Sequence, residues 1–133
     1  MTGEQSQSQT RSNSKSTDIV GWVISSLCVA LLCFSAYMKL SGNTMVVAGF
    51  AKAGYAKNAV IVIGVVEIIC AVLYIVPKTS ILGAILLAGY LGGAICHHVR
   101  SGEPFFIPAV LGNMVWLGIF LREPRLRAIL PFR

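Results

Sequence analysis

Four long apolar stretches, separated by shorter polar segments, dominate the hydropathy pattern of this chain. They cover residues 19–38, 59–76, 80–99 and 104–121, and each has 18 or 20 residues. At 1.5 Å per residue, a helix of this length spans about 27–30 Å, which matches the hydrocarbon layer of a bilayer. The stretches lack the alternation of apolar and polar residues that barrel strands show. The pattern therefore predicts an all-α integral membrane protein, a polytopic four-helix bundle.

The segments outside the four stretches differ in character. Residues 1–18 are rich in Ser, Gln and Thr, which predicts a disordered polar tail, and residues 122–133 form a short basic tail. Between the first two stretches, Asn43 can cap a short helix that stops at Gly54. We expect segment 43–54 to lie along the membrane interface; the alternative is an ordinary loop over the mouth of the bundle.

Composition supports the membrane assignment and isolates one residue. Apolar residues make up 56% of the chain and charged residues 12%, which excludes an ordinary soluble enzyme. Of the 16 charged residues, 15 lie outside the four stretches, and the exception is Glu67. The net charge of +6 fits contact with anionic lipid headgroups, whereas no folded basic surface for nucleic acid is evident.

Glu67 is the strongest candidate for a functional residue. A charged side chain at mid-membrane costs about 2.5–3.5 kcal/mol, so we expect it to face the bundle interior, to be protonated or to be paired. Counting along the helices places Glu67, Tyr90 and Asn113 at the same depth, about 12–14 Å from one membrane face. Two interpretations remain open. Glu67 can bind or exchange a proton with a small ligand such as a quinone headgroup, or it can form a structural hydrogen bond with Asn113 or Tyr90.

Lys39, His97 and His98 all fall near the same ends of their helices. Adjacent residues point about 100° apart on a helix, so His97 and His98 are poorly placed to bind one metal ion, and we expect no metal site. One histidine can turn inward toward Lys39 and the other toward the headgroups. We interpret the three as a polar rim, at the mouth of the Glu67 pocket.

The four cysteines lie inside the apolar stretches, without a C-x-x-C pair. Buried cysteines acting as small apolar residues are the simplest interpretation. The alternative is a redox-active thiol pair formed by Cys33 and Cys96, which share a depth.

Several short motifs resemble one family of membrane proteins. They are Gly89-Tyr90-Leu91-Gly92-Gly93-Ala94, His98-Val99-Arg100, Gly102-Glu103-Pro104-Phe105-Phe106 and Leu121-Arg122-Glu123-Pro124-Arg125-Leu126-Arg127. Their order and spacing resemble the DoxX-like family of small four-helix membrane proteins. That family takes its name from a small subunit of a terminal quinol oxidase or thiosulfate:quinone oxidoreductase, and most members have no assigned biochemistry. The resemblance implies fold and location, and it carries over no catalytic residue.

The leading hypothesis is a small redox-associated subunit of a bacterial-type cell membrane that contacts a quinone and works beside a partner redox protein. Whether it is itself an enzyme stays open, because the sequence has no dinucleotide fingerprint and no cysteine cluster for iron and sulfur. The alternatives are a non-catalytic assembly or scaffold protein and, less favoured, a small transporter. A stripe of small residues in the third stretch serves either packing within the chain or a homo-oligomer contact.

The basic residues predict the orientation of the chain. Seven lie on the side of the two termini and four on the other side, which favours cytoplasmic termini. We therefore expect activity from a reporter that works only in the cytoplasm when it is fused after Arg133. Activity of a periplasmic reporter at this position, with the cytoplasmic one silent, would reverse the orientation.

Overall fold

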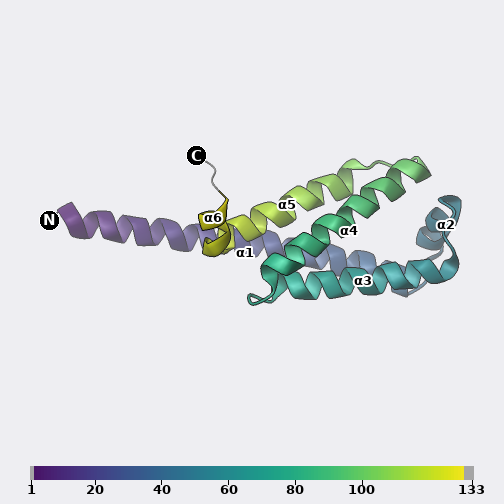
Figure 1. Cartoon of the computed structure of the whole chain (residues 1–133), viewed down its shortest axis with the longest axis horizontal. Coiled ribbons are helices and arrows are strands. Elements are labelled where there is room, and N and C mark those ends of the chain that lie inside the picture. The colour runs from purple at the N-terminus through teal and green to yellow at the C-terminus, as the bar shows by residue number, and fades with distance from the viewer. Residues whose placement is uncertain (1, 131–133) are drawn as a thin grey trace.

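The chain is helical throughout the part that the structure describes (Figure 1). The computed structural model describes residues 2–130, with side chains from residue 15 on. In chain order the helices are α1 (Thr2–Leu40), α2 (Thr44–Lys52), α3 (Lys57–Ile75), α4 (Ser80–Ser101), α5 (Phe106–Arg122) and α6 (Pro124–Ile129).

Three of these helices are long and apolar enough to cross a membrane. They are Lys15–Leu40 within α1, all of α3 and all of α4, whereas α5 is an apolar helix of 17 residues. Large apolar side chains are exposed on these helices, including Ile19, Val62 and Ile85, each more than half exposed. Such a surface is unstable in water and is suited to contact with lipid.

Two helix boundaries differ from the sequence prediction. Helix α1 begins at Thr2, so the segment 1–18 that we predicted to be disordered is helical from its second residue. No glycine or proline interrupts the chain between residues 4 and 20, and extending an existing helix needs no new nucleation. Helix α5 begins at Phe106 rather than at Pro104. Pro108 falls in its first turn, where a missing N–H group breaks no helical hydrogen bond.

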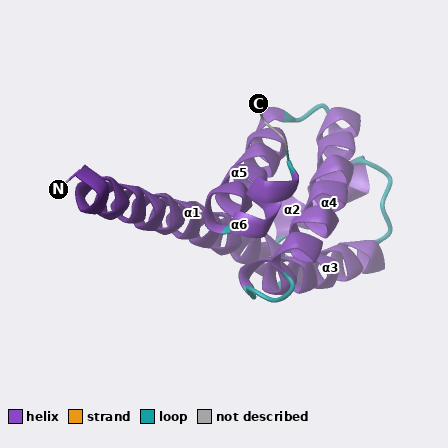
Figure 2. Cartoon of the chain, turned by 60° about the vertical axis from the view of Figure 1, so that its left-hand side comes forward, coloured by secondary structure: helices purple, strands orange, loops and turns teal. Residues whose placement is uncertain are grey.

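Helices α1, α3, α4 and α5 form a wedge. Helix α1 packs against α3 and α5, and α4 completes the ring by packing against the same two helices. Figure 1 shows α1 and α3 running side by side while α4 and α5 diverge from them. We call the end with the α3–α4 turn and α6 the tight end, and the end with α2 the open end. The first part of α1 extends beyond the tight end (Figure 2).

Glycines bring α1 and α5 into contact at the tight end. A Cβ atom added to Gly21 of α1 would lie 2.7 Å from the backbone nitrogen of Arg122. One added to Gly118 of α5 would lie 2.7 Å from the Ser25 hydroxyl oxygen and 2.9 Å from that of Tyr74. Side chains at these two positions would force the helices apart.

A buried polar cluster joins three helices at the same end. The Tyr74 hydroxyl donates to the Val115 carbonyl oxygen at 2.8 Å and lies 2.9 Å from the Ser25 hydroxyl. The Arg122 guanidinium donates to the Tyr74 carbonyl oxygen and stacks over the rings of Trp22 and Tyr74, at 4.5 and 4.6 Å from their centroids. Cation–π contacts are strongest where water is excluded, and Arg122 is only 9% exposed.

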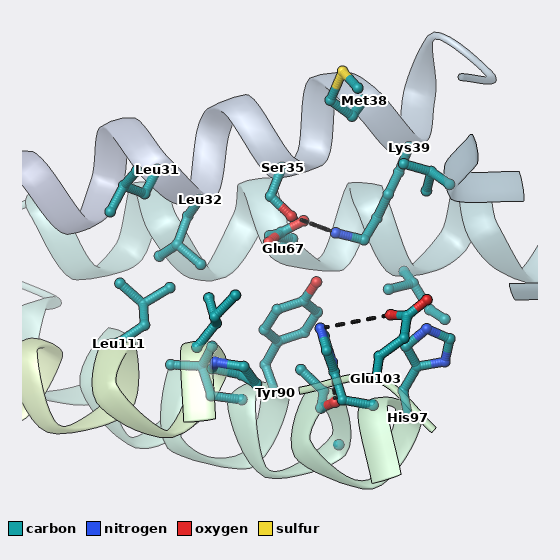
Figure 3. A pocket seen from close by; sticks show the side chains of 18 of the residues that line it. Leu31, Leu32, Ser35, Met38, Lys39, Glu67, Tyr90, His97, Glu103 and Leu111 are labelled. Atoms are coloured by element: carbon teal, nitrogen blue, oxygen red, sulfur yellow. Dashed lines mark hydrogen bonds and ion pairs between the residues drawn. The ribbon is translucent and has the colours of Figure 1, made fainter. Parts of the chain in front are cut away.

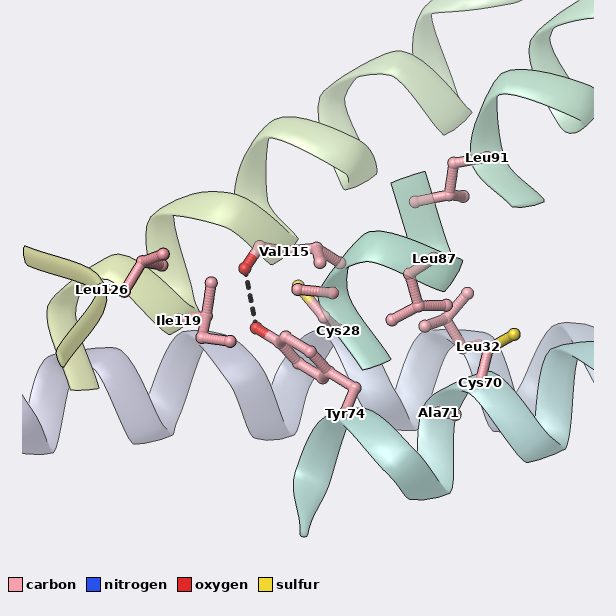
Figure 4. Packing of buried hydrophobic residues seen from close by; sticks show 11 residues of the cluster. Cys28, Leu32, Cys70, Ala71, Tyr74, Leu87, Leu91, Val115, Ile119 and Leu126 are labelled. Carbon is pink, nitrogen blue, oxygen red and sulfur yellow. Dashed lines mark hydrogen bonds between the residues drawn. The ribbon is translucent and has the colours of Figure 1, made fainter. Parts of the chain in front are cut away.

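The apolar core continues from this cluster toward the middle of the bundle (Figure 4). Its members are Cys28, Leu32, Cys70, Ala71, Tyr74, Ala84, Leu87, Leu91, Val115, Ile119 and Leu126. Leu126 belongs to α6, which therefore folds back onto the tight end. Just before it, the Arg125 guanidinium binds both carboxylate oxygens of Glu123 and holds the pKa of that carboxyl below its ordinary value.

Helix α2 lies at the open end. The Asn43 side chain accepts hydrogen bonds from the backbone nitrogens of Met45 and Val46, and the positive φ of Gly54 follows the helix. This helix occupies the segment 43–54 that the sequence marks as interfacial; its depth relative to a membrane stays a prediction.

The close approach of α1 and α5 at the tight end can be tested by replacing glycine with alanine at two separate positions. We expect Gly21→Ala to destabilise the protein by about 1–3 kcal/mol, because the added methyl group overlaps backbone atoms of α5. Gly92→Ala is the matched control, since a Cβ atom there meets nothing within 4 Å. The measurement is the unfolding midpoint in detergent. Equal midpoints for the two variants would contradict the close packing of α1 on α5.

Candidate functional site

A cavity of about 980 Å³ fills the wedge at the open end (Figure 3). Helices α1 to α5 all contribute to its wall, and most of the lining side chains are apolar. The polar ones include Ser35 and Lys39 of α1, Glu67 of α3 and Tyr90 of α4. A mainly apolar cavity with a few convergent polar groups is the usual form of a small-molecule site.

An ion pair between Lys39 and Glu67 is the centre of this polar group. The Lys39 ammonium lies 2.9 Å from Oε2 of Glu67 and donates to the Ser35 hydroxyl at 2.6 Å. The Glu67 side chain is 2% exposed and that of Lys39 is 11% exposed. Neither charge is solvated by bulk water, so each is stabilised chiefly by the other.

Helix packing brings the two charges together. Lys39 lies in the last turn of α1, where the negative end of the helix dipole favours a cation. Gly64 of α3 lies one turn before Glu67, and a Cβ atom there would meet the side chains of Lys39 and Leu40 at 3.2 Å. The absence of a side chain at Gly64 therefore lets the end of α1 lie directly on α3.

Tyr90 approaches the pair from the opposite wall. It is partly buried, and its hydroxyl points across the cavity toward Glu67 and Lys39 (Figure 3). Its side chain interacts with Glu67, so the structure brings together two of the three residues that share a predicted depth. Lys39, which we expected to face an inward-turned histidine, lines the same cavity as His97 and forms its ion pair with Glu67.

Asn113, the third residue at that depth, does not join the cluster. Its side chain is exposed, donates to the Ala109 carbonyl oxygen at 3.0 Å and does not line the cavity. The expected contact between Asn113 and Glu67 was wrong, because counting residues gives the position along a helix but not the direction in which a side chain points. On α5 the cavity wall is formed by Val110, Leu111 and Met114 instead.

The two histidines line the cavity but face different partners. The His97 ring stacks on Phe50 of α2, with centroids 4.3 Å apart and planes at 22°. Its Nδ1 atom is buried and has no hydrogen-bond partner among the described residues. His98 places Nδ1 at 2.8 Å from the Ala94 carbonyl oxygen and Nε2 at 4.0 Å from Glu103. The described residues contain no group of three His, Cys, Asp or Glu side chains that could hold a metal ion.

Comparison with protein families adds to this geometry. A model of the DoxX-like family matches residues 23–121, which is 99 of the 133 residues. The chain belongs to the DoxX-like family. All the residues that line the cavity lie within the matched segment. Comparisons with curated proteins and with solved structures found no match.

The cysteines of this DoxX-like protein divide into two kinds. Cys28 and Cys70 are buried in the core, whereas Cys33 and Cys96 are exposed, and all four are free thiols. Helices α1 and α4 lie diagonally across the ring, and neither Cys33 nor Cys96 lines the cavity. The structure therefore does not form the proposed thiol pair of Cys33 with Cys96.

Sequence reasoning missed two polar residues of the cavity and one buried charge. Ser35 lies four residues before Lys39, a spacing that places the two side chains on one helix face. Glu103 lies five residues after His98, across the turn that follows α4. Arg122 was placed in the short basic tail, but it is buried against Trp22 and Tyr74, aromatic partners whose position the sequence does not reveal.

The buried ion pair predicts a non-additive pattern of stability in this DoxX-like protein. We expect Lys39→Met alone to destabilise it by about 3–5 kcal/mol, because the Glu67 charge is left buried without a partner. The double variant Lys39→Met/Glu67→Met should recover most of this loss. The unfolding free energy in detergent provides the measurement.

The control for this cycle is Lys52→Met, which makes the same change at an exposed lysine of α2 and should stay within about 0.5 kcal/mol of the wild type. Additive effects of the two cavity substitutions would show that the charges are not paired.

Proposed function

We propose that the protein is a redox-associated integral membrane subunit that binds a quinone or a similar lipophilic molecule in its cavity. The observation that carries this proposal is the arrangement of the cavity: apolar walls, with an ion pair and a tyrosine hydroxyl converging inside. A volume of about 980 Å³ lies at the upper end of the range for small-molecule sites.

The polar groups suit both redox forms of a quinone. A quinone carbonyl oxygen accepts hydrogen bonds, and Lys39 and Tyr90 carry the matching donors. A quinol hydroxyl donates a hydrogen bond, and the Glu67 carboxylate is the matching acceptor. The pair of Lys39 and Glu67 has no net charge, which agrees with the neutrality of both forms.

Electron transfer requires a second protein in this proposal. The sequence contains no dinucleotide fingerprint and no cysteine cluster for iron and sulfur. A bound quinone would therefore exchange electrons with a partner redox protein, and this chain would supply the binding site. The name-giving subunit of the DoxX-like family has such an association with a quinone-linked enzyme.

The proposal includes four membrane spans with both termini in the cytoplasm. Helix α5 has 17 residues, about 25 Å at 1.5 Å per residue, which is at the short end of the range for a span. The start of α1 and helix α6 lie toward the tight end, so the open end and its cavity would lie near the outer face of a bacterial-type membrane (Figure 1).

The test is equilibrium binding of decylubiquinone to the protein in nanodiscs. We expect Tyr90→Phe to weaken binding about three- to tenfold, the effect of losing about one buried hydrogen bond. Tyr37→Phe removes the same hydroxyl from a side chain that is 65% exposed and outside the cavity, so it should leave the affinity unchanged. Absence of binding to the wild type would overturn the proposal and favour the scaffold alternative.

A further inference from the structure

The cavity has an apolar opening in the side of the bundle. Several apolar residues that line the cavity from α1 and α5 also have large exposed fractions, which supports an opening of the cavity between these two helices. They are Leu31 (48%) and Phe34 (63%) of α1, and Phe106 (60%), Ile107 (62%) and Val110 (55%) of α5. We call the gap between these two sets the side opening.

The side opening follows from the wedge. Helices α1 and α5 touch at Gly21 and Gly118 and then diverge toward the open end (Figure 1). The residues at the opening are therefore separated by the same divergence that creates the cavity. Every side chain named at its rim is apolar, and the charged pair lies deeper, with Glu67 only 2% exposed.

Helix α2 covers the adjacent end of the cavity. Met45, Val46, Gly49 and Phe50 all line the cavity from this helix. Phe50 is 7% exposed and is stacked on His97 of α4, so this contact packs α2 against the bundle. Helix α2 thus covers part of this end of the cavity, where the lining residues Met45 and Glu103 remain exposed, whereas the opening between α1 and α5 is lined by apolar side chains.

We propose that the ligand is an amphiphile with one apolar chain that enters sideways from the lipid between α1 and α5. Its uncharged polar head lies against Lys39, Glu67 and Tyr90, and its chain lies in the side opening and continues into the bilayer. The nature of the head rests on the proposed function, whereas the chain and the route rest on the opening itself.

The experiment compares two quinones with the same ring in nanodiscs. One is decylubiquinone, and the other carries a methyl group in place of the decyl chain. Both rings are fully substituted, so neither probe alkylates the exposed thiols of Cys33 and Cys96. We expect Val110→Trp to fill the opening and to weaken binding of decylubiquinone at least tenfold, while the affinity for the methyl analogue changes less than twofold.

Each substitution has a control on the same helix. Leu117→Trp lies two turns from Val110, is 49% exposed and lies outside the cavity, so it should leave both affinities unchanged. A second pair on α1 serves if the first variant does not fold: Leu31→Trp at the opening against Leu27→Trp, which is 50% exposed and one turn away.

The outcomes separate this inference from the proposed function. Suppose that decylubiquinone binds the wild type. If the tryptophan variants at the opening then weaken the binding of both probes equally, or weaken the binding of neither, the side opening is not the site of the apolar chain. The proposed function then survives. If neither probe binds the wild type, both proposals are overturned.

Discussion

The contact of Arg122 with Tyr74 and Trp22 fixes the geometry on which the rest of the bundle depends. These residues come from α5, α3 and α1, and the guanidinium holds them together through a backbone carbonyl and two aromatic faces. Gly21 and Gly118 allow the backbones to meet there. Farther along, the same two helices diverge, and their large apolar side chains line the cavity between them (Figure 1).

The ion pair inside the wedge reverses the usual behaviour of a lysine near a helix end. A lysine in this position ordinarily extends toward water to keep its charge solvated. Lys39 instead turns toward Glu67 and Ser35, since Gly64 lets the last turn of α1 rest on α3. Such a pair contributes little net stability, because desolvation offsets most of the attraction. Its effect is to place two opposite charges, with no net charge, in an apolar cavity.

Much of the fold could be predicted from the sequence, because the length of an apolar stretch directly limits a membrane helix. The shared level of Glu67 and Tyr90 along the bundle followed from counting residues, since the rise per residue of a helix is constant. The direction of Asn113 could not be obtained in this way, because it depends on how α5 rotates against its neighbours. The pairing of Lys39 with Glu67, 28 residues apart, depends on the packing of α1 on α3. The helical state of residues 2–18 depends on continuity with α1 rather than on composition.

The two ends of the bundle differ in how closely they are packed, and the cavity at the open end makes that end the place for a ligand. At the tight end, the guanidinium of Arg122 is enclosed by aromatic rings, and added atoms at Gly21 or Gly118 would collide with neighbours. At the open end, Ser35 and Glu67 use two of the three N–H groups of Lys39. Buried nitrogens without a hydrogen-bond partner within the described chain occur at both ends: Nδ1 of His97 at the open end, and Nε and Nη1 of Arg122 at the tight end. Lys39 and Glu67 line a mostly apolar cavity in which water finds few partners, so a molecule with a polar head and an apolar body complements the cavity better than water does.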